Sequence, residues 1–347
     1  MHKAKFGTHN AQEIEKYTLE NQFVQISILN LGGIIQAIKM PDKNGKVEDI
    51  VLGFDNVQDY IKHPYLSGVI GRCANRINNG KLDINGVNTQ LQINNDKHHL
   101  HGGKMGFDRQ VWEVLEMEKR SDETRVLLKY LSPEGEEGYP GNLTVTVEYL
   151  LNNKNELIVD YKANTDKTTI INLTNHPTFN LNGNAKRDIL NHSVQIHSKQ
   201  YLETNEAFIP TGNFIQTKNT YLDLEKATIL LEKLEEFDES AKSYFGYDHC
   251  YNFNNESKEL IKMAEVKSLD SGRKMEVFST EPALQFYTGN GLNGFNGKEH
   301  IPYHTHFGLC LEPQHFPDSP NHPRFPSTLL NPSETYTSQT IYRFAVD

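Results

Sequence analysis

Thr144-Val145-Thr146-Val147-Glu148-Tyr149-Leu150 decides the fold class, because apolar and polar residues alternate along it. Val145, Val147 and Tyr149 share one face of an extended chain, and the polar residues between them share the other. β-branched and aromatic side chains favour a strand that buries one face. The stretch therefore predicts a β-strand rather than an amphipathic helix.

Comparable strand-like runs recur on both sides of this stretch. They are residues 23–29, 87–93, 111–117, 125–131, 156–161, 168–173, 194–197, 261–266, 274–278 and 283–287. Asn-Gly dipeptides, which suit tight hairpin turns, lie between several of them, and Asn85-Gly86 predicts a hairpin most directly. Only residues 56–61 and 231–241 have a pattern typical of short helices. The sequence thus predicts an all-β fold, a large antiparallel sandwich or barrel, as a single domain over residues 1–347.

Composition narrows the choice of partners and compartment. The 347 residues carry 35 basic and 45 acidic side chains, a net charge of −10, which argues against a nucleic-acid or anionic-membrane partner. Cys73, Cys250 and Cys310 are too few and too widely spaced for a disulfide framework, so we expect buried free thiols in a reducing compartment. The N-terminus lacks the apolar run of a signal peptide, and no stretch approaches the ~20 apolar residues of a membrane span. We expect a cytoplasmic protein.

Histidines draw attention first among the polar residues. His98-His99-Leu100-His101-Gly102-Gly103 follows a strand-like run and is interpreted as a loop. Imidazoles are common zinc ligands, but no matched Cys/His spacing occurs elsewhere in the chain. A metal site, a surface loop and a loop that binds a neutral ligand all remain open for this segment.

Two further segments place proton-transfer groups at predicted strand ends. His176 lies in Thr174-Asn175-His176-Pro177, and its ordinary pKa lies near neutrality, so it suits proton donation and acceptance. Glu312 ends the apolar run Gly308-Leu309-Cys310-Leu311, where partial burial would raise its pKa towards the range of a general base. A solvated loop histidine and a surface acid are the simpler alternatives.

Other motifs are either consistent with sugar binding or are discounted. Gly71-Arg72-Cys73-Ala74-Asn75-Arg76-Ile77 and Tyr247-Asp248-His249-Cys250-Tyr251 carry the Arg, Asn, Asp and His groups that bind sugar hydroxyls, although each segment could equally be a structural turn or ion pair. Gly289-Asn290-Gly291-Leu292-Asn293-Gly294 fits the dinucleotide-binding pattern. However, Gly297 and Pro302 prevent the long helix that this pattern requires, so no nucleotide site is expected.

Taken together, these segments resemble the aldose 1-epimerase (galactose mutarotase) family. The motifs follow one another in family order over about residues 30 to 340. They are Gly71-Arg72-Cys73-Ala74-Asn75-Arg76-Ile77, Leu100-His101-Gly102-Gly103, Thr174-Asn175-His176 through Asn180-Leu181-Asn182-Gly183, Tyr247-Asp248-His249, Leu284-Gln285-Phe286-Tyr287-Thr288-Gly289-Asn290, Glu312 through Asn321, and Phe325-Pro326-Ser327-Thr328-Leu329-Leu330. The chain departs from the commoner pattern at Thr178, where Tyr is frequent, and at Asn331-Pro332-Ser333-Glu334, where Gly often precedes the glutamate.

The resemblance implies a fold, an activity and a set of site residues. The fold would be the galactose mutarotase-like supersandwich, an antiparallel β-sandwich with few short helices. The activity would be interconversion of the α and β anomers of free hexoses such as D-galactose and D-glucose, with no cofactor and no metal. Glu312 would be the general base and His176 the general acid. The residues implied for binding sugar hydroxyls are Asn75, Arg76, His101, Asp248 and Gln285.

Three rival activities stay open at this point. A hexose-6-phosphate 1-epimerase would need extra basic residues for the phosphate, and a non-catalytic carbohydrate-binding sandwich would not need a paired acid and base. A glycoside hydrolase would usually use two carboxylates rather than a carboxylate and an imidazole. We expect a small-molecule hexose as the substrate, no nucleic-acid or membrane partner, and a monomer or homodimer.

Overall fold

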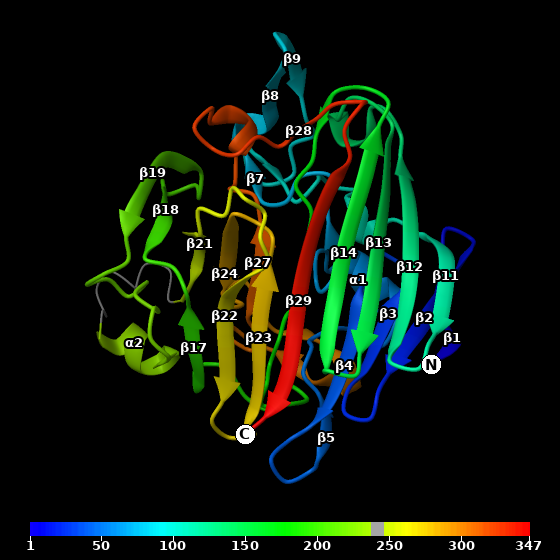
Figure 1. Ribbon diagram of the computed structural model, residues 1–347, viewed down its shortest axis with the longest axis vertical. Helices are drawn as coiled ribbons and strands as arrows, with labels where there is room; N and C mark the ends of the chain where they lie inside the picture. Colours follow the sequence, from blue (N-terminus) through cyan, green and yellow to red (C-terminus); the bar gives the residue numbers. More distant parts are fainter. Residues whose placement is uncertain (237–245) are drawn as a thin grey trace.

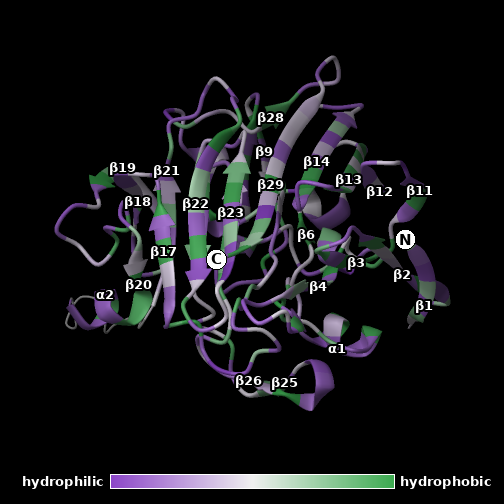
Figure 2. Ribbon diagram, turned by 60° about the horizontal axis from the view of Figure 1, so that its bottom comes forward, coloured by the Kyte–Doolittle hydropathy of each residue, from purple (hydrophilic) through white to green (hydrophobic). Residues whose placement is uncertain are grey.

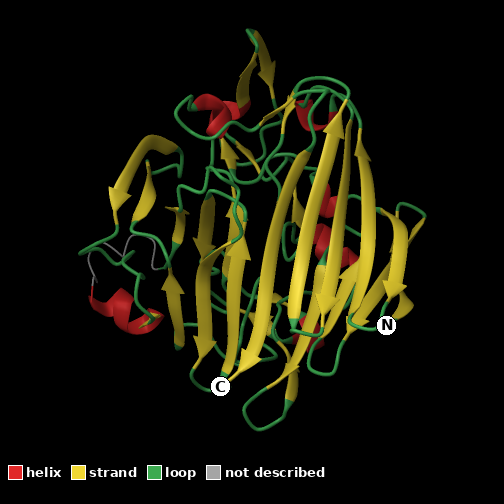
Figure 3. Ribbon diagram, viewed as in Figure 1, coloured by secondary structure: helices red, strands yellow, loops and turns green. Residues whose placement is uncertain are grey.

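The computed structural model describes residues 1–236 and 246–347. Two layers of β-sheet face one another, and loops close the two ends (Figure 1). Helices are short, and strands make up most of the regular structure (Figure 3). The two α-helices in the described chain are α1 (Val57–Lys62), capped by the Asn56 side chain, and α2 (Leu230–Glu236).

One layer is a nine-stranded sheet, with neighbouring strands antiparallel throughout. In spatial order its strands are β11 (Glu113–Lys119), β12 (Glu123–Ser132), β13 (Leu143–Asn152), β14 (Glu156–Thr165), β29 (Tyr336–Val346), β23 (Arg273–Ser279), β22 (Ile261–Ser268), β17 (His192–Ile196) and β20 (Thr228–Ile229). The C-terminal strand β29 therefore lies in the middle of the sheet, between β14 and β23 (Figure 1).

The other layer contains two five-stranded sheets. The first runs β1 (His2–His9), β2 (Gln12–Glu20), β3 (Gln25–Leu29), β4 (Ile35–Pro41) and β5 (Val47–Asp49). The second runs β19 (Pro210–Gln216), β18 (Gln200–Thr204), β21 (Asp248–Asn252), β24 (Ala283–Tyr287) and β27 (Cys310–Gln314).

Five short strand pairs complete the described structure. They are β6 (Val69–Ile70) with β16 (Thr174–Asn175), β7 (Arg76–Ile77) with β10 (His99–Leu100), β8 (Lys81–Ile84) with β9 (Val87–Gln90), β15 (Thr169–Ile170) with β28 (Leu329–Leu330), and β25 (Phe295–Asn296) with β26 (Pro302–Tyr303). The pair β7–β10 carries two residues that line the candidate site, Arg76 and Leu100, and His176 follows directly after β16.

Alternation of side chains explains how the layers hold together. In β13, residues at every second position are buried, and the positions between them are partly exposed. The same banding is visible along β22 and β23 (Figure 2). A continuous core forms between the layers and includes residues from Tyr17 on β2 to Phe344 on β29. Burial of apolar surface of this extent is the main stabilising contribution to such a sandwich.

Several sequence predictions can be checked against these elements. The Asn85-Gly86 hairpin is confirmed: Ile84 pairs with Val87, and the two turn residues have φ of 54° and 81°. The predicted strand at 168–173 is wrong in length, since β15 covers only Thr169–Ile170 and the next residues bond to loops. The helix predicted at 231–241 is present as α2 as far as Glu236, and residues 237–241 lie outside the described residues.

The three cysteines are buried and free, as predicted. Within residues 1–236 and 246–347, no helix has the length and apolar character needed to cross a bilayer.

Candidate active site

A pocket of about 350 Å³ lies on the face of β24 and β27 that points away from the main core. Strand alternation creates this arrangement, since Leu284, Phe286 and Leu311 turn into the core while Gln285 and Glu312 turn into the pocket. Every residue predicted for the site lines this one pocket: Asn75, Arg76, His101, His176, Asp248, Gln285 and Glu312. Residues far apart in the sequence therefore converge as expected, while their individual roles remain predictions.

The three strands β21, β24 and β27 deliver the acidic side of the pocket. Gln285 on β24 pairs directly with Glu312 on β27, so their side chains lie next to each other on the same face. Asp248 begins β21, and its Oδ1 accepts a hydrogen bond of 2.6 Å from Gln285 Nε2. Glu312 is 1% exposed, which places its carboxyl group at the floor of the pocket.

His176 reaches the pocket from the turn after β16. Its backbone is fixed on both sides, because its N–H donates to Gly68 O at 3.0 Å and its carbonyl accepts from Ser67 N–H at 2.9 Å. The side chain places Nε2 at 3.6 Å from Glu312 Oε1. A carboxyl group and an imidazole are thus within reach of a single small ligand.

Burial dominates the electrostatics of this pair. It raises the pKa of Glu312 well above the ordinary value, and the nearby Asp248 charge raises it further. Burial lowers the pKa of His176 to about 4. The two groups are close enough to titrate together.

His101 and Asn75 line the same pocket and are hydrogen-bonded to each other. The Asn75 backbone N–H donates to His101 Nδ1 at 3.2 Å, and His101 N–H donates to the Asn75 carbonyl at 3.1 Å. Burial, followed by the influence of His176, lowers the pKa of His101 well below its ordinary value. A neutral His101 that accepts at Nδ1 must carry its proton on Nε2, which leaves that nitrogen as a donor.

Arg76 and Asp248 supply opposite charges near the pocket. Burial raises the pKa of Asp248, whereas the Arg76 charge and the Gln285 hydrogen bond act in the opposite direction. The Arg76 guanidinium also lies 4.7 Å from the centre of the Phe208 ring. Arg76 is the one lysine or arginine among the described residues that line the pocket.

Some buried polar atoms point to a ligand with hydroxyl groups. Among hydrogen bonds formed within the described chain, Glu312 Oε2 and Gln285 Oε1 have no partner. A buried acceptor without a donor is unfavourable by about 1–3 kcal/mol. Ligand hydroxyl groups would supply the missing donors.

Sequence reasoning missed several residues of the pocket wall. His63, Tyr65, Tyr287, Leu292 and Phe295 also line the pocket, where they offer ring faces and apolar surface. His63 stacks on Phe295 with ring centroids 4.4 Å apart, and Tyr65 lies against His101 at 4.9 Å. Tyr287 falls within a quoted family motif, but the His63–Tyr65 loop gave no local signal.

His176, Cys310 and Glu312 are a group whose donor atoms lie within 4.8 Å of one another. His176 Nδ1 is in hydrogen-bond contact with Cys310 Sγ at 3.4 Å, whereas Nε2 lies 3.6 Å from Glu312 Oε1. The two ring nitrogens therefore turn to different partners.

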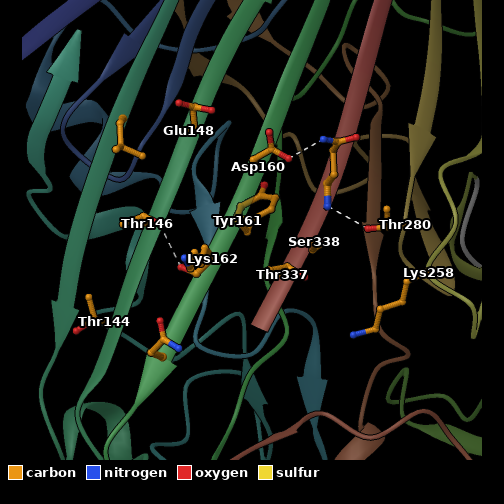
Figure 4. Close-up of a pocket in the computed structure, with 13 residues that line it drawn as sticks. Thr144, Thr146, Glu148, Asp160, Tyr161, Lys162, Lys258, Thr280, Thr337 and Ser338 are labelled. Carbon is orange, nitrogen blue, oxygen red and sulfur yellow. Dashed lines mark hydrogen bonds between the residues drawn. The ribbon is translucent and has the colours of Figure 1, made fainter. Parts of the chain in front are cut away.

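A second hollow, of about 630 Å³, crosses the outer face of the nine-stranded sheet at β13, β14 and β29 (Figure 4). Its lining includes Thr144, Thr146, Asp160 and Lys162, and Asp160 accepts a hydrogen bond from Gln339. No histidine lines it within the described residues. It therefore lacks the paired acid and base of the other pocket.

The fold and the pocket together define a β-sandwich protein with a carboxyl–imidazole pair in a polar, ring-walled pocket. A sequence model of the aldose 1-epimerase family matches residues 15–343, and the chain belongs to this family. Galactose mutarotase from Homo sapiens is 41% identical over 335 residues, covering 96% of this chain and 94% of the relative. Aldose 1-epimerase from Escherichia coli (strain K12) is 34% identical over 342 residues, covering 97% of each chain. The crystal structure of galactose 1-epimerase from Lactobacillus acidophilus is 27% identical, with a TM-score of 0.87, and covers 99% of this chain and 98% of that one.

Proposed function

We propose that the protein is an aldose 1-epimerase that interconverts the α and β anomers of free hexoses such as D-galactose and D-glucose. Relatives of this activity cover nearly the whole chain. The observation that carries the proposal is the 3.6 Å separation of His176 Nε2 and Glu312 Oε1 inside a polar pocket. Such a pair can reach both oxygens bound to C1 of a pyranose.

The chemistry is a pair of proton transfers. Glu312 removes the proton of the C1 hydroxyl while His176 Nε2 donates a proton to the ring oxygen, so the ring opens to the aldehyde. The C1–C2 bond rotates, and reverse transfers close the ring as the other anomer. Each positioned acid or base typically contributes about 10²–10⁴-fold to such a rate.

The reactive form of the pair has the shared proton on His176. Burial opposes this form, because it disfavours both charged groups. Attraction between the resulting imidazolium and carboxylate at 3.6 Å supports it. The reaction then leaves the total number of protons on the enzyme unchanged.

The remaining polar residues would hold the sugar while C1 turns. Asn75, Arg76, His101, Asp248 and Gln285 surround the same pocket and provide both donors and acceptors. Fixing the unreacting hydroxyl groups keeps the reacting oxygens aligned with Glu312 and His176. The aromatic rings of Tyr65 and Tyr287 offer flat surfaces for the apolar faces of the sugar.

The charge of the pocket favours a free sugar over a sugar phosphate. Among its described lining residues, Arg76 is accompanied by the acidic groups Asp248 and Glu312. Phosphate recognition ordinarily requires several cationic or N–H donors without nearby carboxylates. A non-catalytic sugar-binding role is disfavoured because it would leave the buried acid–base pair without a purpose.

Polarimetry tests the proposal directly. Freshly dissolved α-D-galactose should reach its equilibrium rotation faster with the protein than without it, and equally fast when a chelator is present. An unchanged rate with folded protein would exclude the activity. Acceleration of glucose 6-phosphate but not of glucose would instead identify the sugar-phosphate enzyme.

We also propose that residues 1–347 form one catalytic domain, working in the cytoplasm as a monomer or homodimer. The core shared by both layers supports a single domain, and the buried free thiols are consistent with a reducing compartment. Sedimentation velocity would test the oligomeric state; a larger assembly would contradict it.

A further inference from the structure

His176 is hydrogen-bonded on the side of its ring that faces away from Glu312. Cys310 Sγ lies 3.4 Å from His176 Nδ1, and Thr178 Oγ1 lies 3.4 Å from the same sulfur. Thr178 Oγ1–H in turn donates to the His176 carbonyl at 3.5 Å. The three residues therefore form a closed chain that starts and ends on His176.

One direction of hydrogen bonding satisfies every group in this chain and also keeps on Nδ1 the proton that the reaction needs. With the threonine hydroxyl donating to the carbonyl, Thr178 Oγ1 is free to accept from the Cys310 thiol. The sulfur then accepts from His176 Nδ1–H. Cys310 keeps the proton that this requires, because burial, together with the Glu312 charge, raises its pKa well above the ordinary value.

We propose that Cys310, supported by Thr178, is a positioning residue that keeps a proton on Nδ1 of His176 and so reserves Nε2 for the catalytic proton. This inference rests on the proposed function, and it assigns a role to a thiol that does not itself touch the reacting atoms. Cys310 is fully buried at the start of β27, two residues before Glu312, so one strand positions the base and orients the acid.

The reaction explains why this tautomer matters. During ring opening the bond between C1 and the ring oxygen breaks, Nε2 gives its proton to that oxygen, and Glu312 takes the proton of the C1 hydroxyl as the C1=O bond forms. His176 is then neutral, with one proton left. That proton must lie on Nδ1, because Nε2 has to accept the hydroxyl proton again when the ring closes.

The experiment compares matched cysteine variants by histidine ¹⁵N NMR and by kinetics. We expect the free wild-type protein to show a protonated Nδ1 for His176, with the signal assigned by its loss in His176→Gln. Cys310→Ala should let the neutral Nε2–H tautomer appear and lower kcat by about 3- to 10-fold with KM unchanged, the effect of one lost neutral hydrogen bond. Cys310→Ser should retain both properties, because a hydroxyl also accepts and donates.

Cys250→Ala is the matched control. Cys250 is a buried thiol on β21 in the same sheet, but it packs in an apolar cluster with Leu202, Ala283, Phe316 and Phe325. The Cys250→Ala protein should keep the wild-type NMR spectrum and kcat. If Cys250→Ala and Cys310→Ala lowered kcat equally, the effect of Cys310→Ala would be explained by lost packing, and the proposal would be overturned. Thr178→Val supplies a second variant if Cys310→Ala does not fold, and it should shift the tautomer in the same direction.

Three other results would also overturn the proposal. One is an unprotonated Nδ1 in the wild-type protein, and another is a wild-type spectrum and rate in Cys310→Ala. The third is a change of the wild-type spectrum on dialysis against a chelator, which would mean that a metal ion joins these residues. The NMR measurement needs no turnover, so a protein that lacks mutarotase activity but has a protonated Nδ1 would refute the proposed function alone.

Discussion

At the scale of single residues, Glu312 and His176 depend on one another. Each is buried, and burial alone would leave both uncharged. Because Nε2 and Oε1 lie 3.6 Å apart, one proton shared between them can move to whichever group the bound sugar requires. Loss of either side chain should therefore remove most of the chemistry while leaving the hydroxyl-binding groups in place.

Glu312→Gln should lower kcat by about 10²- to 10⁴-fold, because an amide has nearly the same shape but is a very poor base. Galactose binding, measured by calorimetry, should change little. Glu334→Gln is the control, since Glu334 lies in an exposed turn and its carboxylate accepts hydrogen bonds from Asn331. Near-normal mutarotation by the Glu312→Gln protein would remove the assignment of the base.

The pH dependence of kcat/KM should be bell-shaped. On the acid side the pair gains a second proton and Glu312 stops acting as a base, and this limb should lie well below pH 6.5 because the pKa of His176 is lowered to about 4. On the alkaline side the pair loses its last proton, at a pH set by the raised pKa of Glu312. The profile is measured by polarimetry after subtraction of the buffer-catalysed rate. If His176→Asn gives a flat pH profile, this account requires that its remaining rate be low. A flat profile at a near-normal rate would contradict it.

At the scale of elements, a buried arginine joins strand β23 of the large sheet to the β4–β5 turn. Arg273 is fully buried, and its guanidinium donates to Lys46 O at 2.9 Å and to Glu48 Oε2 at 3.2 Å. Lys46 and Lys186 also contact Glu48. Burial tends to raise the pKa of Glu48, but the three cations outweigh it and leave the pKa lowered.

Glu48→Gln should therefore reduce the free energy of unfolding by about 3 kcal/mol at neutral pH, because Arg273 would lose its buried counter-charge. Urea denaturation measures the change, and Glu116→Gln, which breaks a partly exposed pair with Arg125, should cost less than about 1 kcal/mol. A lowered folded-state pKa stabilises the protein above the unfolded value of about 4.3 and loses that effect as pH falls. The difference between wild type and Glu48→Gln should thus shrink in acid, and a constant difference would contradict the role of charge.

At the scale of the whole molecule, one core links the two layers and the two ends of the sequence. Its members include Tyr17 and Phe344, which come from near the two ends of the chain. A core that both layers share should unfold as one unit and not layer by layer.

Unfolding should accordingly occur in one cooperative transition. Trp112, the single tryptophan, reports on the β11 side through fluorescence, and Cys250 reports on the β21 side through thiol labelling identified by mass spectrometry. The two midpoints in urea should coincide, and saturating galactose should move both upward together. Separate midpoints would show two independently folding units and contradict the single-domain proposal.

The sequence by itself determined the fold class and indicated which residues line the pocket. Alternation in residues 144–150 is a local property of the chain, because side chains of a strand point to opposite faces, and it predicted β13 directly. The motifs around His176 and Glu312 predicted a general acid and a general base, and both side chains line one pocket. The strand β29 was not predicted, because the polar residues Ser338 and Thr340 occupy two of its buried positions and weaken the apolar alternation typical of a strand.

Tertiary structure alone decided how the site residues meet. The distance between His176 and Glu312 depends on β16 and β27 being brought together by a core made of both layers, and no local pattern encodes that packing. The contact of Cys310 with His176 Nδ1, the stacking of His63 on Phe295 and the loop that carries Tyr65 arise in the same way. Contacts between residues more than a hundred positions apart are fixed by burial and geometry in the folded chain, which the linear order of residues does not contain.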